Sequence, residues 1–314
     1  MSTEESPTAE AATAPELFPR RLWDEINDLG LQRYIEDLDA QGYTVVPPEI
    51  ANPDGLADRM LEACLDIAER RTGERPDLER GRSEGPFDSP VGDTMKALLL
   101  EDPVFEESLM NPALLALATY LCGYDVVLSS LTSFMKGPSK TRFQLHTDTR
   151  LPSPLPTQAL LCKGIYLLTD FNRDNGSTAF VPGSHRWCRN PDASETSIGE
   201  GGNDQAVPVE APAGSLLVFH GNTWHGAYNR LVPGLRVSVH LLMVRSLLRA
   251  TEDFIGRIPQ RALDRNRPRF AILTQQGVVP GYIDKDDERA KVVRAQRFVS
   301  AYEKDSGVKL PAKR

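Results

Sequence analysis

The residue pattern of this chain changes near Gly123, and that change constrains the possible folds more than any other feature. Beyond it, short runs rich in β-forming residues follow one another, separated by clusters of Pro, Gly and Asn. Such a series predicts an antiparallel sandwich or barrel. Asp174-Asn175-Gly176 is a strong turn signal between the third and fourth runs. The expected strands cover 125–135, 141–147, 159–169, 177–182, 215–219 and 235–245.

The residues before this change are expected to be mainly helical. Apolar residues recur near helical spacing from Arg20 to Gln41, and Gly30 can divide this run into two helices. GYTVV at 42–46 predicts a strand that ends at two prolines. Further helices are expected at 56–70, in 93–122 with a break at Asn111-Pro112, and at 287–304. The predicted organisation is a disordered tail over 1–16 and one domain over 17–314, with a helical part to about 123, a β core over about 125–245 and a helical part over about 250–306.

Charge and composition limit the classes of partner. The 314 residues include 44 acidic and 36 basic side chains, a net charge of -8, which argues against nucleic acid or an anionic membrane as the main partner. No apolar run reaches the roughly 18 residues of a membrane span, and the first residues do not resemble a signal peptide. The four cysteines form no CxxC pair and are expected to be free thiols. We expect a cytoplasmic monomer or homodimer that acts on a small molecule.

Three of only five histidines lie in two segments with metal-binding character. His146 and Asp148 are two residues apart in FQLHTDT, so on a strand both side chains would face the same side. The pair alone is a weak signal, since HxD often occurs by chance. Farther along, GSLLVFHGNTWHGAYNR presents His220 and His225 in a Gly-rich loop after an apolar strand. One of these would complete a set of two histidines and one carboxylate, which leaves positions open on non-haem iron.

Arg236 and Ser238 follow on the next expected strand and share one face of it. A guanidinium fork with a neighbouring hydroxyl is suited to binding a carboxylate through two parallel hydrogen bonds. Exposure on the surface is the alternative for any single arginine.

Taken together, these segments resemble the phytanoyl-CoA dioxygenase family. The likeness is carried by HTD, YLLTDFNRDNGSTAFVPGSHR (166–186), GSLLVFHGNTWHGAYNR and RVS, in that order and spacing, and extends over about 40–245. It implies a mainly β fold with flanking helices and a double-stranded β-helix (jelly-roll, cupin-like) core. It also implies iron(II), with 2-oxoglutarate and dioxygen as cosubstrates.

The resemblance assigns roles to particular residues. His146, Asp148 and His225 become the iron ligands, and Arg236 and Ser238 become the contacts to the distal carboxylate of 2-oxoglutarate. The family's halogenating relatives replace the carboxylate ligand by a small residue. Because Asp148 is present, hydroxylation of a C–H bond is favoured, with 2-oxoglutarate converted to succinate and carbon dioxide.

The other polar candidates are weaker. Lys136 and Gln144, shortly before the HxD pair, could contact the cosubstrate or substrate, as could Tyr166 and Thr169. Structural roles are expected for His185 and His220, whereas His240 shares strand parity with Arg236 and could line the cavity.

Several alternatives stay open at this point. The same ligands serve desaturation, cyclisation and epimerisation, and a jelly-roll binding protein without turnover is a further possibility. Two loops rich in Gly, Pro and Ser, at 78–93 and 149–158, are expected to cover the barrel mouth. Their arginines are diluted by acidic residues, so we favour a free metabolite with an acidic group near Arg150 over a coenzyme A thioester.

Overall fold

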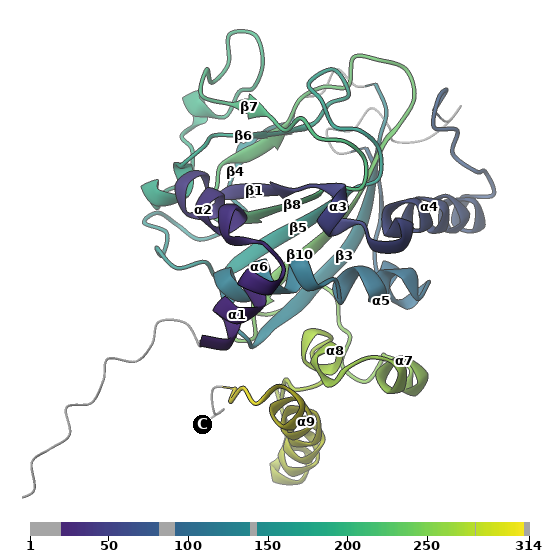
Figure 1. Ribbon diagram of the computed structural model, residues 1–314, viewed down its shortest axis with the longest axis vertical. Helices are drawn as coiled ribbons and strands as arrows, with labels where there is room; N and C mark the ends of the chain where they lie inside the picture. Colours follow the sequence, from purple (N-terminus) through teal and green to yellow (C-terminus); the bar gives the residue numbers. More distant parts are fainter. Residues whose placement is uncertain (1–19, 82–91, 139–142, 280, 311–314) are drawn as a thin grey trace, which may run out of the picture.

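Two antiparallel sheets form the centre of the molecule (Figure 1). The computed structural model describes residues 20–81, 92–138, 143–279 and 281–310. The larger sheet has the order β1-β8-β5-β10-β3-β2 and the smaller one the order β4-β9-β6-β7. The strands are β1 (Tyr43–Val46), β2 (Asp93–Met95), β3 (Val126–Lys136), β4 (Phe143–His146), β5 (Leu161–Leu167), β6 (Thr178–Phe180), β7 (Val207–Pro208), β8 (Leu216–His220), β9 (His225–Ala227) and β10 (Arg236–Arg245). This is the jelly-roll core that the family resemblance implied.

Strand β10 shows why one face of the larger sheet is polar and the other apolar. Val237, Val239 and Leu241 pack into the main apolar core together with residues of the helices. The alternate residues Arg236 and His240 line a cavity on the opposite face. Successive side chains of a strand point to opposite sides, so one strand serves both the core and the interior of the jelly roll.

Helices cover the outer face of the larger sheet (Figure 1). α6 (Pro112–Cys122) lies against β5, β8 and β10, and it approaches so closely that a Cβ added at Gly164 would lie 2.5 Å from Leu114 Cδ1. Asn111 caps this helix by accepting a hydrogen bond from Ala113 N at 3.0 Å. The other helices are α1 (Arg20–Asp28), α2 (Gln32–Gln41), α3 (Pro48–Ala51), α4 (Leu56–Thr72), α5 (Val104–Leu109), α7 (Gln260–Arg265), α8 (Pro268–Leu273) and α9 (Lys285–Ser306).

A second apolar cluster lies between the two sheets. It joins side chains of β5, β6 and β8, and its members are Ile165, Leu167, Phe171, Phe180, Val209, Leu217 and Phe219. Tyr43 of β1 stacks on Phe180 with ring centroids 4.4 Å apart. This cluster fills one end of the jelly roll, and the other end stays available for polar side chains.

Most of the predicted elements are confirmed. All six expected strands are present, Gly30 separates α1 from α2, and the break at Asn111-Pro112 separates α5 from α6. The expected helical start at 93 was wrong, because 93–95 pairs with β3 as β2 and Ala97 adopts a left-handed φ of 58° that a helix cannot continue. The short helices α7 and α8 and the strands β7 and β9 were not predicted.

Some predictions fall on parts of the chain that are not described. The tail at 1–16 and the portion of the 78–93 loop at 82–91 lie outside the described residues. Within the described part of the chain, no helix combines the length and the apolar character that a membrane crossing needs.

Candidate metal centre and active site

Three side chains converge where β4 meets β9. His146 is the last residue of β4, His225 is the first of β9, and the two are direct partners in the register of the smaller sheet. Asp148 follows β4 and donates its backbone N–H to Gly221 O at 3.0 Å. Its carboxylate lies 3.8 Å from His146 Nε2 and 3.6 Å from His225 Nε2. One ligand atom from each residue lies within 4.8 Å of the others, so the predicted triad is brought together.

Backbone carbonyls fix the tautomer of both histidines. His146 Nδ1 lies 3.0 Å from Gln144 O, and His225 Nδ1 lies 3.0 Å from Thr223 O. A carbonyl can only accept, so in each ring Nδ1 carries the hydrogen and Nε2 keeps its lone pair. Both Nε2 atoms face Asp148, which is the orientation that a shared metal ion requires.

Lys163 of β5 contacts the carboxylate of the triad. Its Nζ lies 2.7 Å from Asp148 Oδ2. Burial would raise the pKa of Asp148, but Lys163 and His225 outweigh it and hold that pKa below its usual range. Lys163 was not among the predicted site residues, although its place inside the apolar run 159–169 was an available signal.

The protonation states suit a metal site. Burial lowers the pKa of His146, and burial together with His146 lowers the pKa of His225 to about 3. Both imidazoles are therefore neutral at neutral pH, and Asp148 is ionised. Neutral imidazole and carboxylate are the forms that bind a metal, so the donor set fits iron(II) with two nitrogen ligands and one oxygen ligand.

A pair of buried cations lies beside the triad. Arg236 of β10 and Lys136 of β3 are direct partners across the two strands and are almost fully buried. No described carboxylate forms an ion pair with either of them, and Arg236 Nε is buried without a hydrogen-bond partner. Arg236 Nη1 donates to Gly176 O, and Lys136 Nζ donates to Tyr228 O at 2.7 Å. Buried charges normally have a partner of opposite sign, so this pair is suited to receive the carboxylate of a ligand.

The turn at Asp174-Asn175-Gly176 positions one of these cations. Gly176 has a φ of 76°, and a Cβ there would lie 2.7 Å from Arg230 N. Only glycine fits both conditions without strain. Its carbonyl, which accepts from Arg236, is thereby held beside the guanidinium.

Arg236 and the three ligands line one cavity of about 190 Å³. Lys163, Arg150 and His240 line it too, together with Phe134, Phe143, Ile165, Thr178, Phe219, Gly226 and Ala227. The prediction that Arg236 points into the cavity of the triad is therefore confirmed.

The next four candidates, Ser238, Gln144, Tyr166 and Thr169, are not among the described residues that line this cavity. Ser238 is buried on the same face of β10, with its Oγ 3.0 Å from His240 Nε2. The Gln144 side chain is exposed and is not among the described residues that line the cavity; its backbone carbonyl, however, orients His146. Tyr166 faces the helices and donates to Ser108 O at 2.7 Å, and Thr169 Oγ1 accepts from Val237 N at 3.1 Å.

Neither His220 nor His185 is among the described residues that line the cavity of the triad. His220 is the last residue of β8 rather than part of a loop, and it is paired with Cys162, which packs in the helical core. Its Nδ1 accepts from Asn222 N at 3.0 Å. The ring of His185 lies 5.5 Å from that of His220. These contacts agree with the structural roles expected for His185 and His220.

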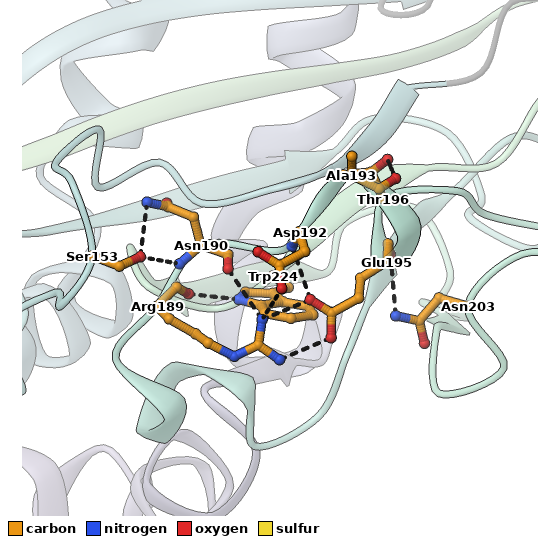
Figure 2. Close-up of polar contacts among 9 residues, drawn as sticks. All are labelled: Ser153, Arg189, Asn190, Asp192, Ala193, Glu195, Thr196, Asn203 and Trp224. Atoms are coloured by element: carbon orange, nitrogen blue, oxygen red, sulfur yellow. Dashed lines mark hydrogen bonds and ion pairs between the residues drawn. The ribbon is translucent and has the colours of Figure 1, made fainter.

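Hydrogen bonds of Arg189 and Asn190 reach the segments that carry the metal ligands. Figure 2 shows the part of this network that joins Asn190 to Ser153 and Arg189 to Trp224. Thr147, between the first two ligands, donates to Asn190 Oδ1 at 2.6 Å, and Asn190 Nδ2 donates to Leu151 O at 2.9 Å. Trp224, which precedes the third ligand, donates from Nε1 to Arg189 O at 2.9 Å. The segment 189–190 therefore holds both ligand-bearing segments.

The loop at 149–158 is attached to the same region. Beyond the Asn190 contact, Leu155 N donates to Cys188 O at 2.6 Å and Asn222 Nδ2 donates to Pro156 O at 2.8 Å. The loop is adjacent to the site as expected, and these bonds hold it in place.

A jelly roll with two histidines and one carboxylate at its mouth defines a class, the non-haem iron oxygenases. Comparison with known proteins identifies the family. The model of the phytanoyl-CoA dioxygenase family matches residues 38–237, more than half of the chain. The chain belongs to the phytanoyl-CoA dioxygenase family, which makes it a dioxygenase by class.

Curated relatives agree with this family. A protein of Aspergillus fumigatus described as dioxygenase af480 is 30% identical over 125 residues, which span 40% of this chain and 39% of that relative. The dioxygenase aneA of Aspergillus aculeatus is 28% identical over 221 residues, 68% of this chain and 69% of the relative.

Solved structures show the same fold. HygX of Streptomyces hygroscopicus, determined with nickel and 2-oxoglutarate bound, aligns with a TM-score of 0.54 at 16% identity, over 70% of this chain and 88% of its own. The epimerase SnoN from nogalamycin biosynthesis aligns with a TM-score of 0.51 at 22% identity, over 71% and 87%. Structures of these two neighbours hold 2-oxoglutarate with nickel or Fe3+, and HygX has also been determined with iron bound. In this chain the triad provides a donor set that fits the metal expected from the sequence.

Proposed function

We propose that this protein is an iron(II)- and 2-oxoglutarate-dependent dioxygenase that hydroxylates a C–H bond of a small-molecule metabolite. The observation that supports this most directly is the triad with both Nε2 lone pairs directed at Asp148, together with the buried basic side chains of Arg236 and Lys136, which form no ion pair with any described residue. A purely structural site would need neither feature. Bound iron and 2-oxoglutarate supply the oxidising chemistry, in which one oxygen atom enters the substrate, one enters succinate, and carbon dioxide leaves.

The residues of the chain have separate tasks in this function. His146, Asp148 and His225 would hold the metal, and Arg236 with Lys136 would hold the distal carboxylate of 2-oxoglutarate through charge-assisted hydrogen bonds. Ser238, on the same face of β10, would add a hydroxyl to that site. Holding the cosubstrate at one end and the metal at the other fixes its orientation before the substrate arrives.

Walls of the site exclude water. Phe219 and Phe180 pack against the ring of His225, with centroids 4.6 Å and 5.9 Å away. Phe143 packs against His146 at 4.7 Å. Apolar rings on one side of the ligands leave the cavity as the route of approach, which protects a reactive site from unwanted hydrolysis.

The first test is whether the purified protein with iron(II) converts 2-oxoglutarate to succinate. A matched pair of variants localises the activity: His225→Ala should abolish succinate formation, whereas His220→Asn should retain it, because His220 faces the helical core. Lack of succinate formation by the wild type would support the alternative of a non-catalytic jelly-roll binding protein.

A second test separates reaction outcomes. Desaturation, cyclisation and epimerisation use the same ligands and differ in where the substrate lies relative to the metal. Mass spectrometry of the product resolves them, since hydroxylation adds one oxygen atom from labelled dioxygen. Lack of label in an altered product would refute hydroxylation.

The free thiols of all four cysteines agree with the proposal of a cytoplasmic location.

A further inference from the structure

A larger cavity of about 670 Å³ adjoins the metal centre. It lies on the interior faces of β3, β5 and β10 and shares five lining residues with the smaller cavity, namely Phe134, Asp148, Arg150, Lys163 and His240. A molecule bound there would reach the metal ligands. The smaller cavity takes the cosubstrate in the function proposed above, so the larger one is left for the substrate.

The charges around this cavity are predominantly positive. Four of its lining residues are cations and one, Asp148, is an anion. The ion pair of Lys163 with Asp148 compensates one cation. The other three, Lys96, Arg150 and Arg249, form no ion pair with any residue that the structure describes, and all three are exposed at the rim.

One acidic residue lies near the rim. Lys96 acts electrostatically on Glu252, whose carboxylate also accepts from Ala97 N at 2.8 Å and from Leu131 N at 3.0 Å. Among the described lining residues, the net positive charge of the rim therefore rests chiefly on Arg150 and Arg249. The chain as a whole carries a net charge of -8. A concentration of unpaired positive charge at the mouth of one cavity, on an otherwise acidic protein, attracts anions to that cavity.

One part of the cavity wall is apolar, and another carries hydroxyl groups. The apolar part is formed by residues of β5, β10 and the segments next to them, which are Leu160, Leu161, Leu242, Val244 and Leu248. The hydroxyl groups belong to Thr94, Ser129, Ser130, Thr132, Thr149 and Thr251. An apolar wall beneath a cationic rim complements a molecule with an apolar body and a single acidic end.

We propose that the substrate is an amphipathic organic anion, whose acidic group is attracted to the mouth of the cavity by Arg150 and Arg249 while its apolar body lies along the leucines. This inference rests on the proposed function for its role as substrate. A coenzyme A thioester would need several clustered cations for its phosphates, and three rim cations spread around one mouth favour a single acidic group instead.

Binding of two matched dyes tests this without requiring turnover. 8-Anilino-1-naphthalenesulfonate and N-phenyl-1-naphthylamine share an aromatic skeleton, and only the first carries an anionic group. Their fluorescence is titrated anaerobically against protein saturated with nickel(II) and 2-oxoglutarate, so that the cosubstrate site is filled. We expect the wild type to bind the sulfonate roughly tenfold more tightly than the neutral dye, since charge-assisted contacts are worth about one such factor or more.

Variants localise the effect. Arg150→Gln with Arg249→Gln should remove the preference for the sulfonate and leave the neutral dye unaffected, whereas Arg261→Gln, an exposed arginine on α7, should change neither. Leu242→Trp, which fills the cavity, should weaken both dyes. Equal affinity for the two dyes, a preference that survives loss of both arginines, or binding that survives Leu242→Trp would overturn the proposal.

Different results would refute the proposed activity and the proposed substrate class. Succinate formation without anion preference would refute the substrate class alone, and anion preference without succinate formation would refute the proposed activity alone. A further measurement compares succinate formation in the presence of decanoate and of decanoyl-CoA. Stimulation by decanoyl-CoA but not by decanoate would overturn the choice of a free acid.

Discussion

Lys136 is a buried lysine beside a buried arginine, and this makes 2-oxoglutarate binding sensitive to pH. Burial, assisted by Arg236, lowers the pKa of Lys136 to about 7. A bound carboxylate would favour the charged ammonium and raise that pKa again. Binding therefore takes up a proton wherever the pH lies above the pKa of the free protein.

The direction and size of the change in 2-oxoglutarate affinity follow from the difference between the pKa of Lys136 in the free protein and its pKa in the complex. Below pH 7 the free protein already carries the proton, and affinity is at its full value. Above pH 7 the lysine must first be protonated, so affinity for 2-oxoglutarate should fall by up to about tenfold per pH unit, or about 1.4 kcal/mol. Between pH 7 and pH 9 the loss approaches roughly a hundredfold. His225, with a pKa of about 3, is neutral throughout this range and contributes no proton.

Isothermal titration calorimetry of the nickel(II)-loaded protein measures both quantities. Affinity is determined from pH 6.5 to 9, and proton uptake is counted at pH 8.5 from two buffers with different ionisation enthalpies. We expect uptake of about one proton, in keeping with the linkage relation. Lys136→Met should bind weakly at pH 6.5 and show a flat profile. A wild-type affinity that stays constant up to pH 8.5, without proton uptake, would refute the assignment of Lys136 to the carboxylate site.

Three further changes test the metal centre, the carboxylate site and the fold. Asp148→Ala should abolish both succinate formation and tight metal binding, and wild-type product levels would contradict the ligand assignment. Arg236→Lys should raise the 2-oxoglutarate requirement by about tenfold or more with metal affinity unchanged, because an ammonium cannot replace a planar fork; an unaltered requirement would place the carboxylate elsewhere. Gly164→Val should lower the free energy of unfolding in urea by about 1–3 kcal/mol, since its Cβ would meet Leu114 at 2.5 Å, and an unchanged midpoint would show that α6 can move away.

The sequence predicted that His146, Asp148 and His225 converge, from the spacing of the first two and from the family resemblance for the third. His146 and Asp148 are two residues apart, and the turn residues that precede and follow His225 are part of the same family pattern. The family resemblance placed Arg236 at the cosubstrate site, and strand parity gave His240 the same face of β10, which lines the cavity. The spacing of His146 and Asp148 and the alternation along a strand depend only on nearby residues, so they can be read from the sequence.

Contacts across strands were beyond the reach of sequence reasoning. Lys163 meets Asp148 only because β5 lies beneath the loop after β4, and neither residue signals the other. Strand β9 has three residues, His225–Ala227, too few for an alternating pattern, and its pairing with β4 and β6 defines it. The helical spacing expected from 93 was overridden by pairing of 93–95 with β3. Each miss reflects tertiary pairing that prevails over local preference.

Asn190 provides the last test, because it links Thr147, which lies between two metal ligands, to the loop that lines the larger cavity. Asn190→Ala removes the hydrogen bonds to Thr147 and to Leu151 O. At about 0.5–1.5 kcal/mol each, these account for about 1–3 kcal/mol of stability. Without its hydrogen bond to Asn190, Thr147 should hold His146 and Asp148 less firmly. Nickel(II) binding should then weaken by about tenfold, as it does when residues that orient metal ligands are changed.

Asn190→Asp separates positioning from general stability. A carboxylate still accepts from Thr147 but no longer donates to Leu151 O, so this variant should lose stability and recover most of the metal affinity. Competition with a chelator measures the affinity, and thermal unfolding measures the stability. If Asn190→Ala and Asn190→Asp lose metal affinity equally, the Thr147 contact does not position the triad. If both bind nickel(II) as the wild type does, His146 and Asp148 are held by their own backbone contacts, the bonds to Gln144 O and Gly221 O.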